Sequence, residues 1–557
     1  MTAVTADRTA EAAAAIRTNR LAMVVAASSA GTVFEWYDFF VFGSLAAIIG
    51  RHFFAGVGES QGYLLALLTF AAGFAVRPIG AIVFGWFGDR TGRKRTFLVT
   101  ISVMGLATFL VAVLPGQAAI GPVAPFALVA LRMLQGFAIG GEYGGAAIYV
   151  AEHTVARRRG LATSWIQSAA GFGLALALVV ILVVRHALGE HAFVAWGWRV
   201  PFALSLVLLA LSLWIRLKLE ESPAFRRIEA AGALSRAPLS EAFLRGRNLR
   251  RVLVVLFGIL AGQGVVWYTA QFYTQFFLER VLAVPSATVN GLLLVATLAS
   301  APLYLAFGWL SDRIGRKPVM LFGLGLAAVS FIPGFRWMAG AANPELVRAS
   351  ERAPVVVVAP PARCSLQFDL IGTARSVTGC DLAKSALADR GITYTNRAAP
   401  PGSPATILIG NERVVSLAIG AGSGPALANR KAQFERRLAA ALVAAGYPPV
   451  AARERIDIGA TLAALMLFLV AATALYGPQA ALLVELFPVR IRYTALSVPY
   501  HIGVGWFGGF LPATAFAIVA ATGNIYAGLW YPVGVATLGF FVTLWFLPET
   551  LHDPATE

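Results

Sequence analysis

The decapeptide GWFGDRTGRK at residues 85–94 recurs as GWLSDRIGRK at residues 308–317, with seven of the ten positions identical. Each copy follows the second of a series of apolar stretches, so the chain is predicted to consist of two related halves. A second, weaker repeat places Glu152 and Glu485 ahead of arginines at matching positions. Because the members of this pair lie farther apart than the two decapeptides, the second half must contain extra residues, which we assign to 341–456.

The composition is that of a membrane protein. The chain has 557 residues, of which 58% are hydrophobic and only 13% are charged, whereas a soluble domain is about 25% charged. It offers about a dozen stretches of the roughly 20 apolar residues that a transmembrane helix needs. We therefore predict an all-α polytopic membrane protein with about 12 transmembrane helices in two pseudo-symmetric six-helix bundles. The predicted segments are 1–20 (N-terminal tail), 21–217 (first bundle), 218–251 (linker), 252–340 (helices 7–9), 341–456 (inserted domain), 457–547 (helices 10–12) and 548–557 (C-terminal tail).

The positive charges favour one orientation in the membrane. The formal net charge is +17, but the Lys and Arg residues stand in short clusters between apolar stretches, which is typical of cytoplasmic loops rather than of a nucleic-acid-binding surface. Three arginines precede the first apolar stretch, so the N-terminus is predicted to stay in the cytoplasm. An even number of spans brings the C-terminus to the same side. We expect a multi-pass protein of a bacterial cell inner membrane, with a periplasmic inserted domain.

The inserted domain carries both cysteines of the chain, Cys364 and Cys380. Two cysteines in one exported segment fit a single disulfide bond. The residue pattern predicts a small α+β unit, with strands at 365–370, 406–409 and 413–419 and an amphipathic helix at 429–444. We recognise no binding motif in it.

Further motifs accompany the repeated loop. They are EWYDF at 35–39, RPIG at 77–80, RMLQG at 132–136, GGEYGG at 140–145, WRVPF at 198–202 and ELFPVR at 485–490. Together with the Gly-x-x-x-Asp-Arg-x-Gly-Arg-Lys loop, they resemble the metabolite:proton symporters of the major facilitator superfamily, which include shikimate, citrate, α-ketoglutarate and proline/betaine carriers. The resemblance covers nearly the whole chain except the insertion. It implies a substrate site at the midplane between two halves that rock to expose it alternately.

The resemblance also implies a gate at the cytoplasmic face. Asp89 and Asp312 are expected to bind arginines or helix ends and to hold this face shut when the site faces outward. The alternative is that the loops only set the topology through their positive charge. The predicted gate residues are Gly85, Asp89, Arg90, Gly92, Arg93, Glu152, Arg157, Gly308, Asp312, Arg313, Gly315, Arg316, Glu485 and Arg490.

Ionisable groups inside the apolar spans are candidates for proton coupling and substrate binding, because placing a charge there costs roughly 2.5–3.5 kcal/mol. Glu35 and Asp38 share one helix face, and a salt bridge from Arg77 on the neighbouring helix to either acid is expected. We hypothesise that one acid takes up a proton and frees Arg77 or Arg132 to hold substrate. The alternative is that these groups are buried ion pairs that only fix helix packing. The other candidates are Gln135, Glu142, Gln263, Tyr268, Gln271 and Tyr500.

The sequence contains no Gly-x-x-x-x-Gly-Lys-Ser/Thr phosphate loop, zinc-spaced cysteines or nucleophile elbow. An ATP-driven pump, an enzyme and a cofactor are therefore not expected. The predicted function is secondary active, proton-coupled uptake of a small polar metabolite, with an organic carboxylate favoured as substrate. The expected partners are this substrate, protons and membrane lipid. The alternatives are uptake of a zwitterion such as proline or betaine, proton-driven export of drugs or metabolites, and a membrane-anchored sensor whose insertion binds a ligand.

Overall fold

The computed structural model describes residues 2–55, 59–218, 220–361, 364, 378–388, 390–417 and 425–551. Within these residues, nine helices are long and apolar enough to cross a membrane. Those of the first half are α4 (Arg93–Val113), α6 (Val123–Glu152), α7 (Arg159–Leu188) and α9 (Arg199–Leu217). Those of the second half are the continuous helix Gly246–Val281, α15 (Ser286–Ile314), α16 (Arg316–Ala342), α20 (Ile458–Leu486) and α23 (Trp530–Phe546).

Three further helical stretches complete the two halves. In the first half, α1 (Thr2–Ser44) and α3 (Glu59–Thr91) precede α4. In the second half, α21 (Arg492–Tyr500) continues through a π-helical segment, His501–Gly508, towards α22 (Leu511–Thr522). The chain is an all-α polytopic membrane protein with two six-helix bundles, as its sequence predicts.

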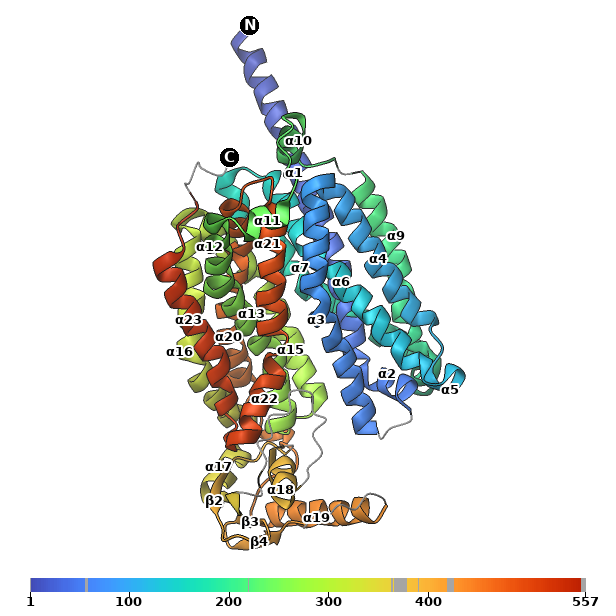
Figure 1. The fold of residues 1–557 in the computed structure, drawn as a ribbon, viewed down its shortest axis with the longest axis vertical. Coiled ribbons are helices and arrows are strands. Elements are labelled where there is room, and N and C mark those ends of the chain that lie inside the picture. Colours follow the sequence, from blue (N-terminus) through green and yellow to red (C-terminus); the bar gives the residue numbers. More distant parts are fainter. Residues whose placement is uncertain are drawn as a thin grey trace.

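The two bundles stand beside each other, and the start of α1 lies at the end of the molecule opposite the inserted domain (Figure 1). We call the end with the start of α1 the terminal face and the end with the inserted domain the outer face. Short helices connect the spans: α2 (Ala46–Phe53), α5 (Gln117–Ile120) and α8 (Glu190–Ala192) in the first bundle, and α10 (Pro223–Ala230) and α11 (Pro238–Phe243) between the bundles. The helices of the two bundles meet near the terminal face and diverge towards the outer face (Figure 1).

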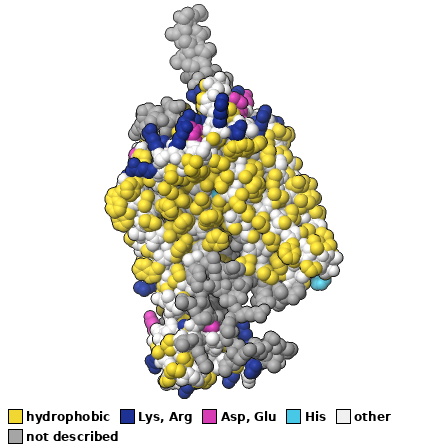
Figure 2. Space-filling view, viewed as in Figure 1, with side chains coloured by type: hydrophobic (Ala, Val, Ile, Leu, Met, Phe, Trp, Pro, Cys, Tyr) yellow, Lys and Arg dark blue, Asp and Glu magenta, His cyan; other side chains and the backbone are white. Residues whose placement is uncertain are grey.

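An apolar belt covers the bundles on the face shown in Figure 2. Large apolar side chains of the spans, such as Leu182, Val183 and Val207, are exposed. A soluble protein rarely exposes so wide an apolar surface, whereas a membrane protein turns it towards lipid. Lys and Arg side chains gather along the rim of the belt at the terminal face (Figure 2).

The first span of the second bundle, which we call helix 7, is wound irregularly. It consists of α12 (Gly246–Val255), α13 (Ala261–Tyr268) and α14 (Thr274–Phe276), each followed by a π-helical segment: Leu256–Leu260, Thr269–Tyr273 and Phe277–Val281. It packs against the stretch from α21 to α22, which we call helix 11. Glycines permit this approach, because a Cβ on Gly264 would lie 2.8 Å from the carbonyl oxygen of Gly503. Such π-helical turns often mark functional sites.

The inserted domain, between α16 and α20, contains a four-stranded sheet in the order β2-β1-β3-β4. The first strand, β1 (Val355–Ala359), pairs in parallel with β2 (Tyr394–Ala398) and antiparallel with β3 (Thr406–Ile409), which forms a hairpin with β4 (Glu412–Val415). The helices are α17 (Pro344–Arg352), α18 (Gly379–Ala388) and α19 (Pro425–Ala444). The structure joins Cys364 to Cys380 by a disulfide bond.

The predicted elements of the insertion agree only in part with the structure. The strand predicted at 406–409 is β3, and the helix predicted at 429–444 lies within α19. The strand predicted at 413–419 is replaced by the shorter β4, and the one predicted at 365–370 lies outside the described residues. Neither β1 nor β2 was predicted: β1 is a continuous run of valines without polar alternation, as expected of a strand in the middle of a sheet, and β2 has the sequence YTNRA, of which only the first residue is buried.

Candidate functional site

Asp89, at the end of α3, links the first bundle to the second. Its buried carboxylate accepts hydrogen bonds from the backbone N–H groups of Tyr493 and Thr494, at 3.1 and 2.9 Å, at the start of α21. The first N–H groups of a helix have no partner within it and carry partial positive charge, so a carboxylate there is stabilised. Gly85 permits the contact, because a Cβ there would lie 2.9 Å from the Cα of Thr494.

Asp312, at the end of α15, makes the reciprocal link. Its carboxylate accepts hydrogen bonds from the N–H groups of Gly160 and Leu161, at 2.9 and 2.8 Å, at the start of α7. A Cβ on Gly308 would lie 2.6 Å from the carbonyl oxygen of Gly160. Each copy of the repeated decapeptide therefore binds a helix start of the opposite bundle, and the terminal face is closed by two equivalent contacts.

Two buried arginines support these acids. Arg93 donates to Asp89 at 3.2 Å and to the carbonyl oxygen of Val489, in the opposite bundle, at 2.6 Å. Arg316 donates to Asp312 at 2.6 Å and to Glu485 at 3.1 Å. Buried guanidinium groups need such partners, because an unpaired buried charge is costly.

Glu152, at the end of α6, provides a third link between the bundles. It forms a buried ion pair of 2.8 Å with Arg492 at the start of α21. Arg492 is one of the two arginines that follow Glu485 in the second repeat; the other, Arg490, pairs with Glu241 of α11 at 2.9 Å. Burial lowers the pKa of the neighbouring His153, so this imidazole stays neutral at physiological pH.

Two glutamates that the sequence analysis did not identify hold the decapeptide loops. Glu221 accepts hydrogen bonds from the backbone N–H groups of Arg93 and Lys94, each at 3.1 Å, and Glu549 accepts them from Arg316 and Lys317 at 2.9 and 3.1 Å. In each loop a glycine with positive φ, Gly92 (106°) or Gly315 (104°), turns the chain into the capped helix. The signal that could have revealed these residues is the acid that follows the last span of each half.

Three predicted gate arginines make no such link in the part of the chain that the structure describes. Arg90 and Arg313 lie over the rings of Trp86 and Trp309, at 4.8 and 3.9 Å from the ring centroids. Arg157 is exposed. Their positions suit cations at the membrane surface rather than a contact between the bundles.

A cavity lined by residues of both bundles lies between them. The first bundle lines it with Glu35, Trp36, Phe39, Arg77 and Tyr143 among others, and the second bundle with Trp267, Tyr268, Tyr476, Tyr500 and His501. Tyr143 and Tyr500 stack across the boundary with ring centroids 3.8 Å apart, and Trp36 lies 5.7 Å from Trp267. The cavity therefore combines aromatic faces with one guanidinium and one carboxylate.

Arg77 is the cation in the wall of this cavity. Its guanidinium lies 4.1 Å from the ring centroid of Phe74 and 5.2 Å from that of Phe39. Among the described residues, no carboxylate lies within ion-pair distance of it. A buried guanidinium flanked by aromatic rings is a suitable ligand for a carboxylate.

The expected salt bridge from Arg77 to Glu35 or Asp38 is therefore wrong for this structure. Glu35 pairs instead with Arg216, at the end of α9, at 3.0 Å, and the same guanidinium binds Glu142 at 2.9 Å. We call these three residues the buried triad. The sequence analysis missed Arg216 because it lies at the edge of its span, beside the basic linker, where a cation is read as a loop residue.

Asp38 and Arg132 belong to a neighbouring polar cluster. Asp38 accepts a hydrogen bond of 2.6 Å from Ser205. Arg132 donates to Gln135 at 2.6 Å, and Gln135 donates to Thr108 at 2.9 Å. Arg132 also lies 5.5 Å from the ring centroid of Phe39, the ring that Arg77 contacts, so Phe39 separates this cluster from the cavity cation.

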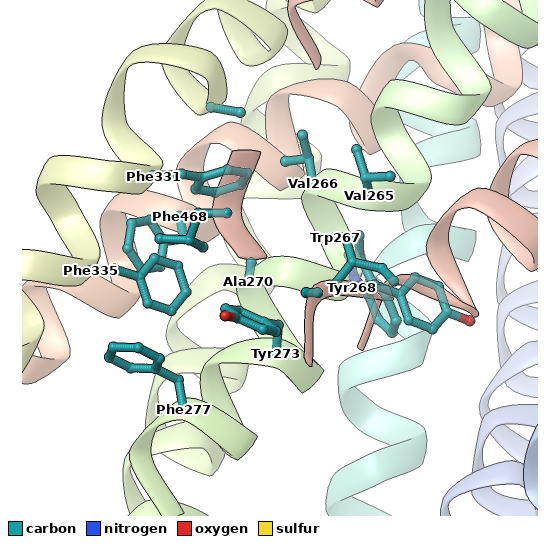
Figure 3. Close-up of a cluster of buried hydrophobic side chains, with 14 of the residues drawn as sticks. Val265, Val266, Trp267, Tyr268, Ala270, Tyr273, Phe277, Phe331, Phe335 and Phe468 are labelled. Atoms are coloured by element: carbon teal, nitrogen blue, oxygen red, sulfur yellow. The ribbon is translucent and has the colours of Figure 1, made fainter. Parts of the chain in front are cut away.

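The candidates on helix 7 divide into two groups. Tyr268 lines the cavity, as does Tyr500 of helix 11. Gln271 donates to Thr297 of α15 at 3.2 Å, and Gln263 is fully buried inside the second bundle. Figure 3 shows the two sides of helix 7, with Trp267 and Tyr268 directed away from the cluster that contains Tyr273, Phe277 and Phe335.

The two bundles, the closed terminal face and the central cavity define a secondary transporter of the major facilitator superfamily. The family model "Sugar (and other) transporter" matches residues 23–240 and 438–557, and the chain belongs to this family. The residues between the two matched segments include most of the inserted domain.

Relatives with assigned substrates agree with this placement. The chain is 38% identical to the shikimate transporter of Escherichia coli over 314 residues, which are 55% of this chain and 70% of that protein. It is 34% identical to the α-ketoglutarate permease of the same organism (57% and 72%) and 34% identical to its proline/betaine transporter (57% and 64%). The chain is a metabolite transporter and not an enzyme.

Solved structures show the same fold. A double tryptophan mutant of the xylose transporter XylE superposes with a TM-score of 0.64 at 16% identity, covering 96% of this chain and 97% of the other. The proton:xylose symporter XylE bound to 6-bromo-6-deoxy-D-glucose gives 0.58 at 18% identity, with the same coverage.

Proposed function

We propose that this protein takes up a small organic carboxylate together with protons. The observation that carries the proposal is Arg77, a buried guanidinium in the cavity wall for which the described residues supply no carboxylate. A substrate carboxylate would satisfy it, because a charged hydrogen bond of this kind contributes about 1.5–3 kcal/mol. The aromatic side chains around it offer ring faces and hydroxyl groups to the rest of the substrate.

The buried triad supports the proton as the coupling ion. Glu35 and Glu142 share one guanidinium, so with both acids ionised the triad carries an excess negative charge away from water. Burial makes an uncompensated charge costly, and binding one proton neutralises it. Glu35 also lines the cavity, so a proton has a route to the triad.

The charges support an orientation with the terminal face in the cytoplasm. The basic rim at the terminal face matches the cytoplasmic side of a membrane protein (Figure 2). The contacts of Asp89, Asp312 and Glu152 at this face support its assignment as the closed side, with the cavity facing outward. Rocking of the bundles about the cavity would break these contacts and release the substrate inside.

Uptake of zwitterions such as betaine is the second candidate. The ring faces of Trp36, Trp267 and the cavity tyrosines could bind a quaternary ammonium group by cation–π attraction. Such a substrate would place its carboxylate on Arg77 as well.

Proteoliposome uptake distinguishes these possibilities. We expect labelled carboxylates to accumulate when the proton gradient is directed inward, and we expect the Arg77→Gln variant to raise KM about 30-fold, because about 2 kcal/mol of charged hydrogen bonding is lost. The control is Arg336→Gln, since Arg336 is exposed and contacts Tyr526 rather than the cavity. Accumulation driven only by an outward gradient would indicate an exporter, and preferential uptake of betaine would favour the zwitterion.

A further inference from the structure

The inserted domain is attached to the second bundle at more places than its two chain connections. At its base, the N–H of Asp457 donates to the carbonyl oxygen of Ala341 at 2.9 Å. The segments by which the chain enters and leaves the domain therefore lie side by side. An ion pair between Arg455 and Glu345 lies near this base. This base would be enough to attach the domain, but the domain makes two further contacts with the second bundle.

The first contact reaches the outer end of helix 7. The N–H of Ala451 donates to the carbonyl oxygen of Ala283 at 3.0 Å. Gly391 packs directly on Val281, whose Cα would lie 2.2 Å from a Cβ on that glycine. Asn343, at the end of α16, completes the attachment by donating to the carbonyl oxygen of Leu282 at 2.9 Å.

The second contact reaches the outer end of helix 11. The N–H of Tyr394, the first residue of β2, donates to the carbonyl oxygen of Gly523 at 2.8 Å. Gly523 ends α22 with a φ of 76°, and a Cβ there would lie 2.4 Å from the carbonyl oxygen of Tyr394. Both contacts are too close to admit a side chain.

Helices 7 and 11 are the irregularly wound helices that line the cavity. Helix 7 supplies Trp267 and Tyr268, and helix 11 supplies Tyr500 and His501. Each contains π-helical turns, where the hydrogen-bond ladder is already interrupted and a helix can change its winding or bend. A domain that holds the outer ends of these two helices can therefore change the shape of the cavity that they line.

We propose that the inserted domain positions the outer ends of helices 7 and 11 and thereby favours the state whose cavity opens to the outer face. The domain supports the cavity wall by holding these two helix ends in the arrangement of this structure. This role rests on the alternating-access fold and is independent of the substrate and of proton coupling. It predicts that loosening either contact reduces access to the cavity from the outer side.

The test uses single glycines with matched controls. Gly391→Ala and Gly523→Ala place a methyl group in the two contacts. Gly402→Ala and Gly446→Ala also place an alanine at positive φ (87° and 88°, against 64° and 76° at Gly391 and Gly523), but nothing lies within 4 Å of the added Cβ. A cysteine at Thr32, a cavity residue of the first bundle, serves as the reporter. Both native cysteines form the disulfide bond, so a thiol reagent modifies only the reporter.

The measurement is the rate at which a membrane-impermeant maleimide, added from the outer side to spheroplasts, labels the reporter. We expect Gly391→Ala and Gly523→Ala each to slow labelling at least threefold and the two controls to leave it unchanged. Equal rates in all four variants would overturn the proposal, and so would equal slowing by the controls. A non-reducing gel that shows the disulfide intact in each variant separates loss of contact from misfolding, and because no substrate is used, failure of the proposed uptake does not affect the result.

Discussion

At the scale of single residues, the buried triad contains an imbalance of charge. Glu35 and Glu142 come from different helices and meet on Arg216, whose guanidinium also lies 3.5 Å from the ring centroid of Phe97. One oxygen of Glu142 is buried without a hydrogen-bond partner among the described residues. A proton on this oxygen would remove the excess charge, so Glu142 is as strong a candidate for the coupling site as Glu35.

Replacing Glu142 by Gln tests this assignment. The variant keeps the Glu35–Arg216 pair but has no excess charge, so we expect it to exchange internal for external substrate while losing accumulation driven by a proton gradient. The measurements are counterflow exchange and gradient-driven uptake in the same proteoliposomes. Glu190→Gln, which alters an exposed ion pair with Arg185, is the control. Undiminished accumulation by the Glu142 variant would exclude the triad as the coupling site.

The sequence revealed only part of this arrangement. Acids and cations inside apolar spans are visible without a structure, and Glu35, Asp38, Arg77 and Arg132 were found in this way. Which of these residues pair with each other was not predicted, because the depth of a residue in the membrane does not determine which helix faces meet. Arg216 comes from the sixth span and reaches inward past Gly31, where a Cβ would lie 2.1 Å from its guanidinium. A long side chain can extend from the end of a helix into the bundle, so the position of its residue along the span does not show where its charged group lies.

At the scale of elements, the gate consists of carboxylates placed on helix starts. Asp89 caps α21 and Asp312 caps α7, each from the opposite bundle. Helix starts attract anions through their free N–H groups and their dipole. Arginines or helix ends were the expected partners of these acids, but the sequence could not specify which helix starts would supply the N–H groups, namely those of Gly160, Leu161, Tyr493 and Thr494.

Equivalent contacts should have equivalent energies. We expect Asp89→Asn and Asp312→Asn each to weaken the closed terminal face by about 1 kcal/mol, which corresponds to roughly fivefold, and the effects to add in the double variant, because the sites are separate. The measurement is labelling of the Thr32 cysteine from the terminal face in inside-out vesicles, which should become faster. Glu190→Gln, which alters an exposed ion pair with Arg185, is the control. A double variant no faster than either single variant would show that one contact alone controls closure.

At the scale of the whole molecule, the two halves and an insertion after the ninth span were predicted from the repeat and its spacing, and a gate at one face from the resemblance of the repeated loop to a known family. Hydrophobicity and repetition are sufficient to predict this architecture, because in lipid each span must form its backbone hydrogen bonds internally, as a helix. The attachment of the insertion to helices 7 and 11 was not predicted, because contacts between a folded domain and the helix ends leave no periodic signal.

Removing the insertion should leave a transporter. Because Asp457 and Ala341 are hydrogen-bonded, residues 344–456 can be replaced by a short flexible linker without moving α16 or α20. We expect gradient-driven uptake to remain measurable, since the cavity and the gate lie in the bundles, but with a lower maximal rate. Uptake assays on the shortened chain and on the full chain at equal abundance provide the comparison. Complete loss of uptake by a shortened chain that remains monodisperse would favour the sensor alternative.

The bond between Cys364 and Cys380 has a consequence for biogenesis. Such bonds form in oxidising compartments, and these cysteines lie between the ninth and tenth spans of the growing polypeptide. Once the segment has been exported, folded and oxidised, it is too bulky to slip back through the translocation channel. The disulfide bond would then keep the folded segment outside and make the insertion of the last three spans irreversible. Host strains that lack thiol-oxidising enzymes should therefore yield less correctly inserted protein.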